Sequence, residues 1–282
     1  MAPEDLIVSS PTLVSPPETL ARLLSILDNP HANLGDAHRL IEYDPGLSTR
    51  VLKLVNSALY GLPGKVSTIS RAVSLIGARD IRNLAVATLV MDRFSTLPDG
   101  LISMRQFWSV SVRTALWARE LAKRLPDNHH PVENDTLFLC GLLREIGCLV
   151  MYHEIPELAR AAVMRARAEK RPDHEVEREM LGFDHYAVGA ALSKHWRLPE
   201  IIAEVQTYLN TPEQAPRWKG ETLLIRLAGL VGQITESLAA REIPSSAEPL
   251  MQALALTDQH LLEAEHEVEA NFEQIWRAIY SQ

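Results

Sequence analysis

The stretch that decides the fold is residues 135–151, which reads DTLFLCGLLREIGCLVM. Of the 16 residues from Thr136 to Met151, 11 are apolar, and at helical spacing they surround the whole cylinder, which predicts a helix at the centre of the fold. Arg144 and Glu145 are its only charges. Adjacent helix residues point about 100° apart and do not pair with each other. Each charge is therefore expected to find a partner on another element or a route to solvent.

The segments on either side of this stretch also show helical periodicity, and no alternating run of Val, Ile and Thr predicts a strand. The chain is therefore predicted to be all-α. Helix starts are marked by residues that cap well: Ser15, with Glu18 completing a capping box, Asp44 before Pro45, and Asp184. Gly77 is expected to end a short helix that begins near residue 68.

Towards the C-terminus the Pro-rich stretch 210–218 reads as a linker. After Thr257, apolar residues recur at helical spacing from Leu261 to Ile279, and the opposite face of this predicted helix is strongly acidic. Two interpretations are open. The apolar stripe pairs with a partner or a second copy of the chain, or it folds back on the chain's own core, which is the simpler arrangement.

Composition excludes several classes of protein. The 282 residues are 46% hydrophobic and 23% charged, which excludes a disordered or fibrous chain. A formal net charge of -8 argues against a general nucleic-acid binder. No apolar run reaches the length of a membrane span and no signal sequence is evident, so a cytoplasmic protein without membrane contact is expected. Cys140 and Cys148 have no zinc spacing and suit buried thiols in a reducing compartment.

Three blocks of sequence, in order, resemble the HDOD family, a bacterial signalling branch of the HD-domain phosphohydrolase superfamily. The first is IEYDPGL at 41–47, which runs on to KLVNSA at 53–58 and is followed by ISRAV at 69–73 and LIG at 75–77. The second is FLCGLLREIG at 138–147, which is similar to the family's F-x-x-G-L-L-H-D-I-G helix. The third is LGFDH at 181–185 with HWRLP at 195–199. Their order and spacing make the resemblance specific.

The resemblance implies a domain over residues 15–209, made of an N-terminal helical lobe (15–100) packed on an HD-like helical lobe (101–209). Residues 219–282 would form a C-terminal helical extension that completes the second lobe. It also implies a role in bacterial signal transduction, but a shared fold does not by itself imply catalysis.

Active HD enzymes bind divalent metal through a histidine, a His-Asp pair and a later aspartate. The matching positions here hold Val110, the pair Arg144 and Glu145, and Gly229. A guanidinium repels a metal ion and cannot coordinate it. The resemblance therefore predicts no catalytic residue, no metal site and no cofactor in this chain.

The candidate site is instead a degenerate cleft formed by Arg144, Glu145, Asp184 and His185. Either the cleft binds an anion or a partner through the guanidinium, or Arg144 forms an internal ion pair, with Asp184 or with neighbours of Glu145, that holds helices together. His185 is expected to satisfy a helix start or a buried contact. A basic helical face at 160–171 is expected to be solvated, the alternative being attraction of nucleic acid or an acidic protein.

These observations favour a non-catalytic regulatory module that acts through protein partners of a signalling pathway, with or without a small ligand in the cleft. The alternative is a metal-dependent phosphohydrolase or cyclic-nucleotide phosphodiesterase with unorthodox ligands. A third hypothesis, a nucleic-acid-binding regulator, requires salt-sensitive association with DNA. Self-association into a homo-oligomer is left open by the sequence.

Overall fold

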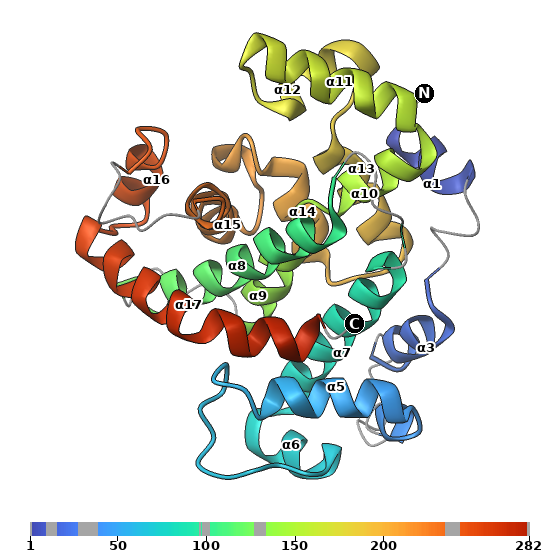
Figure 1. Cartoon of the computed structure of the whole chain (residues 1–282), viewed down its shortest axis with the longest axis vertical. Coiled ribbons are helices and arrows are strands. Elements are labelled where there is room, and N and C mark those ends of the chain that lie inside the picture. The colour runs from blue at the N-terminus through green and yellow to red at the C-terminus, as the bar shows by residue number, and fades with distance from the viewer. Residues whose placement is uncertain are drawn as a thin grey trace.

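In the computed structural model the fold is built from helices, as predicted (Figure 1). The structure describes residues 2–9, 16–27, 39–95, 97, 102–126, 134–234 and 243–280. Within these ranges it contains no strand. The all-α fold class is thereby confirmed.

The N-terminal helices gather around one long helix, α7 (Ala78–Ser95). Packed against it are α3 (Glu18–Leu27), α5 (Pro45–Val55) and α6 (Ile69–Ile76), and α5 and α6 lie at the lower end of Figure 1. Two predicted caps are present. The Asp44 side chain accepts from the Leu47 amide, and Gly77 ends α6 with a positive φ of 89°. Ser15, predicted to cap the first helix, lies outside the described residues.

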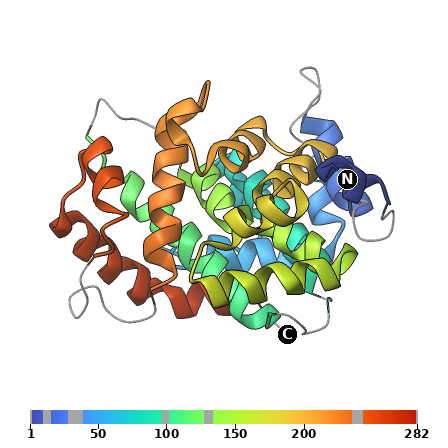
Figure 2. The ribbon, with the colours of Figure 1, turned by 90° about the horizontal axis from the view of Figure 1, so that it is seen from above.

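Helix α7 also joins this group to the rest of the molecule. It packs on α9 (Asn134–Leu143), which in turn lies against α8 (Met104–Ala122). Near the end of α7 the ring of Phe94 lies 5.8 Å from that of Trp196, and both side chains are fully buried. Along α8 also runs α15 (Lys219–Gly232), which stands upright in orange in Figure 2.

The apolar stretch quoted at the outset is not one continuous helix. Helix α9 ends at Leu143, Arg144 and Glu145 form a turn, and α10 (Ile146–Glu154) begins after them. Glu145 has φ -100° and ψ 10°, and its carbonyl accepts from the Cys148 amide in a tight turn. The prediction of a single helix from Thr136 to Met151 was therefore wrong at the two charged positions, although the segment is central and buried as expected.

Helix α13 (His185–His195) approaches α10 very closely. A side chain at Gly147 would meet the backbone of His185 and would lie 2.6 Å from the Gly189 amide nitrogen. The two helices therefore touch backbone to backbone. Helix α14 (Glu200–Tyr208) follows α13 and packs on it, and the short 3-10 helix η2 (Pro212–Gln214) leads to α15.

Two further elements border α13. Helices α11 (Pro156–Glu169) and α12 (Asp173–Leu181) form a hairpin at the upper end of Figure 1. The N-terminal helix α1 (Pro3–Ser9) lies on α13 and α10, where Leu6 and Ile7 are buried. The sequence patterns did not predict α1, because seven residues are too few to establish a period.

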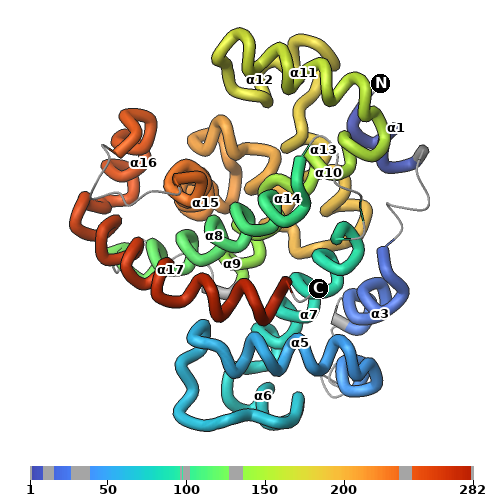
Figure 3. The backbone as a smooth tube through the Cα atoms, viewed as in Figure 1, coloured from blue at the N-terminus to red at the C-terminus, as the bar shows by residue number. Residues whose placement is uncertain are grey.

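The C-terminal helix folds back on the chain's own core, which was the simpler of the two interpretations. Helix α17 (Asp258–Ile279), preceded by α16 (Glu248–Ala253), crosses α8 and α5 (Figure 3). Its stripe from Leu261 to Ile279 is buried. The Arg113 side chain of α8 pairs with Glu269 and lies over the Phe272 ring, 4.0 Å from its centroid. The acidic face is thus tied in part to α8.

One segment, Thr136–Glu154, is long and apolar enough to cross a membrane by length and composition alone. Some 83% of it is buried inside the fold, the position of the core helix of a folded domain. No other described segment meets the same criteria.

Candidate functional site

The turn between α9 and α10 brings Arg144 and Glu145 together. Arg144 Nη2 lies 2.5 Å from Glu145 Oε1, an ion pair whose angles do not make it a directed hydrogen bond. The expectation that these neighbours would not pair was wrong, because it assumed helical geometry and the helix is broken at this point. Only 5% of Arg144 is exposed. A charge buried to this degree is stable only when it is paired.

His185, the first residue of α13, lies between two carboxylates. Its Nε2 is 2.8 Å from Glu145 Oε2, and its Nδ1 is 2.6 Å from Glu177 Oε2 on α12. The same Glu177 oxygen accepts from the His185 amide at 2.9 Å. Tyr186 donates its hydroxyl to Glu145 Oε1 at 3.2 Å. The result is a buried chain of charges, Arg144, Glu145, His185 and Glu177, that joins three elements.

The electrostatics of this chain favour its charged forms. Burial opposes ionisation of Glu145, but the Arg144 guanidinium and the His185 imidazole outweigh it and hold the pKa of Glu145 well below its usual range. Burial also opposes a charged His185, yet Cys148, Glu145 and Glu177 around the ring outweigh it and raise the pKa of His185 well above its ordinary value. The protonated ring, with a carboxylate beside each nitrogen, is therefore the favoured form.

Arg144 occupies the space that a side chain at Gly229 would need. A Cβ at that position would meet the guanidinium and would lie 2.6 Å from Arg144 Cζ. Arg144 and Gly229, two of the four positions that the family resemblance connects with metal binding, are therefore in direct contact, with the guanidinium lying against the bare backbone of α15. Val110, another of the four, lines the same cavity as Arg144.

Asp184, which was predicted to belong to the cleft, instead caps a helix and forms an ion pair away from Arg144. One of its oxygens accepts from the Ala187 amide and so caps α13, as predicted, and the other accepts from Arg178 Nε at 2.8 Å. It makes no ion pair with Arg144. Of the partners considered for Arg144, Asp184 is thus not the one observed, because its carboxylate is held at the helix cap.

A cavity of about 830 Å³ opens beside the charged chain. Its lining comes in part from the α11–α12 hairpin and in part from α8, α10, α13 and α15. Arg144, Glu145, Cys148 and His185 line it, with aromatic and apolar groups from several elements. Its size is within the range of sites for small organic ligands.

Glu177 and Cys148 are members of this site that the sequence patterns did not single out. Glu177 is in the middle of an amphipathic helix with several other acidic residues, and nothing in that pattern distinguishes it. Cys148 donates to Glu145 Oε2 at 3.7 Å, and burial raises the pKa of its thiol to about 12. Its distance of three residues from Glu145 is the only signal that the sequence offered.

The fit of this site to a divalent metal is poor. Ligand atoms of Glu145, Cys148 and His185 lie within 4.8 Å of one another, the one such group among the described residues. However, both nitrogens of His185 face carboxylates, and the Arg144 guanidinium lies against Glu145. A histidine binds a metal ion through a neutral imidazole, whereas the surroundings of His185 favour its protonated form. The Arg144 guanidinium, 2.5 Å from the Glu145 carboxylate, would compete with a metal ion for that carboxylate.

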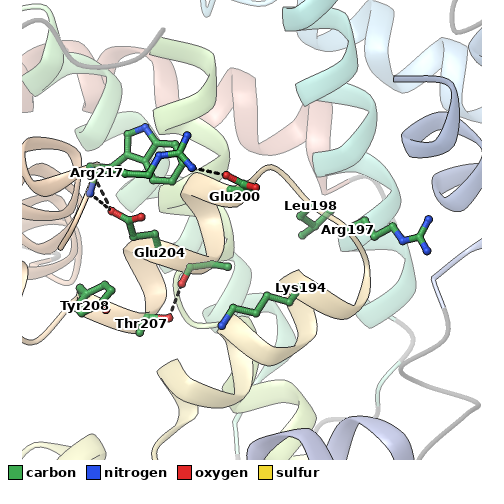
Figure 4. Close-up of a pocket in the computed structure, with 10 residues that line it drawn as sticks. Lys194, Arg197, Leu198, Glu200, Glu204, Thr207, Tyr208 and Arg217 are labelled. Carbon is green, nitrogen blue, oxygen red and sulfur yellow. Dashed lines mark hydrogen bonds and ion pairs between the residues drawn. The ribbon is translucent and has the colours of Figure 1, made fainter. Parts of the chain in front are cut away.

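A second cavity, of about 590 Å³, lies on the surface along α14 (Figure 4). Arg217 bridges to Glu200 at 2.6 Å and lies over the Trp218 ring, and Glu204 accepts from the amides of both Arg217 and Trp218. None of the charged side chains that line it is buried. This cavity therefore lacks the enclosed polar groups that characterise the first one.

The basic face predicted at 160–171 is neutralised in part within the hairpin. Arg165 pairs with Glu169 and Glu179, and Arg171 pairs with the same two carboxylates and with Glu175. Arg167 lines the large cavity, as Arg171 does, but unlike Arg171 it forms no ion pair with any residue that the structure describes.

Comparison with known proteins gives consistent results. Residues 13–212 match the family model of the HDOD domain. An uncharacterised protein of Treponema pallidum (strain Nichols) is 29% identical over 260 residues, which are 88% of this chain and 49% of that protein. The chain thus spans about half the length of the curated relative it matches.

Two solved structures show the same fold. One is a candidate phosphohydrolase from Shewanella amazonensis, 23% identical, with a TM-score of 0.75 over 97% of this chain and 96% of the other. The second is an HDOD domain protein with unknown function from Geobacter sulfurreducens, 21% identical, with a TM-score of 0.71 over 94% and 93% of the two chains. At these identities the likeness concerns the fold alone.

Proposed function

The chain belongs to the HDOD family, and from this premise we propose that it is a non-catalytic module of signal transduction that acts by contact with a protein partner. The observation that carries the proposal is the place of Arg144. Its guanidinium lies against Gly229 and pairs with Glu145 at the positions where the family resemblance connects residues with metal. A fixed positive charge there takes the place of the divalent cation on which HD hydrolysis depends.

The chemistry of the remaining groups supports the same conclusion. The carboxylates of Glu145 and Glu177 lie 2.8 Å and 2.6 Å from the two ring nitrogens of His185 and favour its protonated form, which has no lone pair with which to accept a proton. Burial keeps the Cys148 thiol protonated at neutral pH, with its pKa at about 12, and a thiol is a poor nucleophile. Neither His185 nor Cys148 is therefore suited to activate water.

The alternative function is a metal-dependent phosphohydrolase with unorthodox ligands. One observation favours it, the grouping of Glu145, Cys148 and His185 within 4.8 Å. It would require His185 to lose its proton and Cys148 to ionise, because a metal binds the thiolate and the neutral imidazole.

Metal content and hydrolysis together test the proposal. The purified protein is incubated with Mn²⁺, Fe²⁺, Mg²⁺ or Ni²⁺, desalted, and analysed for bound metal, and is then assayed with p-nitrophenyl phosphate and bis(p-nitrophenyl) phosphate. We expect well below one ion per chain and no turnover above buffer. One ion per chain together with hydrolysis, both lost in Cys148→Ser, would establish the alternative instead.

A further inference from the structure

The large cavity differs in charge from the protein as a whole. The chain carries a formal net charge of -8. Among the residues that line the cavity, guanidinium groups outnumber carboxylates: Arg144, Arg167, Arg171 and Arg226 against Glu145 and Asp173. His185, whose pKa is raised, also lines it, whereas burial lowers the pKa of His174 and favours its neutral form. The wall of the cavity is therefore positive in an acidic protein, and a charge of this sign attracts anions.

Pairing inside the protein does not account for all of these cations. Glu145 is matched by Arg144 and His185, and Arg171 is matched by glutamates of the hairpin. Arg226 of α15 donates only to the Asn210 carbonyl, at 2.9 Å, and has no carboxylate partner among the described residues. Arg167 of α11 likewise forms no ion pair with a described residue, although its charge acts on Asp173 of the same cavity. Arg226 and Arg167 therefore leave two cations, on different elements, that are not held in ion pairs.

Arg144 supplies a buried donor as well. Its Nε has no hydrogen-bond acceptor within the described part of the chain, and the atom is shielded from solvent. A buried donor without an acceptor costs about 1–3 kcal/mol. An anion that reaches the Arg144 side chain would relieve this cost and would find a fixed planar donor group.

The remaining wall is apolar. Phe107 and Val110 of α8 contribute to it, together with Leu209 and with Leu230 of α15, and Tyr152 and Tyr186 present rings. A bare inorganic ion would leave this surface in contact with water. A ligand with a hydrophobic body would cover it and would gain roughly 25 cal/mol for each Å² of apolar surface removed from water.

We infer that the cavity binds a small organic anion, a molecule with an aromatic or aliphatic body and one carboxylate or phosphate group. In this proposal Arg226 binds the acidic group, with Arg167 and Arg144 adding positive charge to the same lining, and the body lies against Phe107 and its apolar neighbours. This inference rests on the proposed function, in which such a ligand is the signal that the module reads. It differs from metal binding in the sign of the charge that the site accepts.

Calorimetric titration of the full chain at constant ionic strength tests the inference with four probes: inorganic phosphate, phenyl phosphate, phenylacetate and the uncharged 2-phenylethanol. At least one of the two aromatic anions is expected to bind at least tenfold more tightly than inorganic phosphate and 2-phenylethanol. Comparison of phenyl phosphate with phenylacetate shows which acidic group is preferred. Equal binding of charged and uncharged aromatic probes, or no binding by any, would overturn the inference.

Two arginine variants locate the site. Arg226→Gln is expected to weaken the best anionic probe about tenfold, because it removes one charge-assisted contact. Arg217→Gln, at the exposed surface of the second cavity, is the matched control and should leave binding unchanged. If both variants bind like the wild type, the anion binds elsewhere and the inference fails.

The outcome is distinguishable from failure of the proposed function. Hydrolysis of phenyl phosphate by a metal-loaded protein would refute the non-catalytic role while leaving phenylacetate binding as a separate result. A metal-free protein that binds none of the anions would retain the proposed function and lose only its ligand.

Discussion

Substitution of Gly229 by alanine probes the contact on which the site depends. The new methyl group would meet the Arg144 guanidinium and lie 2.6 Å from Cζ, so the guanidinium must move. If it stayed buried without Glu145, the loss of a buried pair would cost about 3–5 kcal/mol. The adjoining cavity of about 830 Å³ gives it room to turn outward, so we expect the smaller cost of overpacking, about 1–3 kcal/mol.

Alanine also favours the helix, which opposes this cost by up to about 1 kcal/mol. Gly220→Ala in the first turn of the same helix is the matched control, because a Cβ there meets nothing within 4 Å. The measurement is urea unfolding followed by circular dichroism. Relative to Gly220→Ala, we expect Gly229→Ala to lower the free energy of unfolding by about 1–3 kcal/mol.

A double-mutant cycle separates the contact with Arg144 from other effects. In the Arg144→Ala background, Gly229→Ala should lose its penalty because the group it displaces is gone. A penalty below about 0.5 kcal/mol in the wild-type background, which is within the usual additivity error, would refute the packing of Arg144 on Gly229. So would an equal penalty in both backgrounds.

Three further predictions concern the same region. The folded protein holds the His185 proton more tightly than the unfolded chain does, because the pKa of His185 is raised in the fold. The protonated His185 therefore contributes its full stabilisation below about pH 6.5, the pKa of a free histidine, and this contribution declines as the pH rises towards the raised folded pKa. Urea unfolding between pH 5.5 and 8.5 should show this decline, and a slope unchanged in His185→Gln would contradict it. Gly147→Ala, whose new methyl group would press on the backbone of α13, should lower the free energy of unfolding by more than about 3 kcal/mol or abolish soluble expression. Gly64→Ala is the control, because a Cβ there has open space around it, and it should have neither effect. A folded, stable Gly147→Ala protein would disprove the close approach of α10 and α13. Because burial raises the pKa of Cys148 to about 12, iodoacetamide at pH 8 should label it far more slowly than free cysteine, as followed by mass spectrometry, and rapid labelling would show an ionised thiol.

Local features of this fold could be predicted from the sequence because their cause is local. The caps at Asp44, Gly77 and Asp184 depend on hydrogen bonds or backbone angles within one turn, and all three are observed. The burial of the segment from Thr136 to Met151 follows from its apolar residues alone. The family, too, could be identified from three blocks of sequence, and the match over 13–212 confirms it.

The arrangement of the site could not be predicted, because it depends on contacts between elements. The break at Arg144 and Glu145 arises within a sequence that favours an unbroken helix, and it reverses the expected relation of the two charges. Glu177 reaches His185 only because the hairpin folds towards α13. The close approach of α10 and α13 had one feature in the sequence that could have indicated it, the glycines Gly147 and Gly189. Small residues on both helices permit the two backbones to approach.

The chain of charges from Arg144 through Glu145 and His185 to Glu177 has a mechanical consequence. It connects Arg144, which lines the cavity, to Glu177 of α12. Loss of the ion pair at one end would therefore change the strength of the ion pair at the other. A molecule that draws Arg144 away from Glu145 would leave His185 as the remaining cation beside that carboxylate. The stronger attraction between Glu145 and His185 would then weaken the ion pair between His185 and Glu177. If the cavity binds the proposed anion, this chain of contacts would transmit its occupancy to the outer hairpin, where the proposed protein partner could sense it.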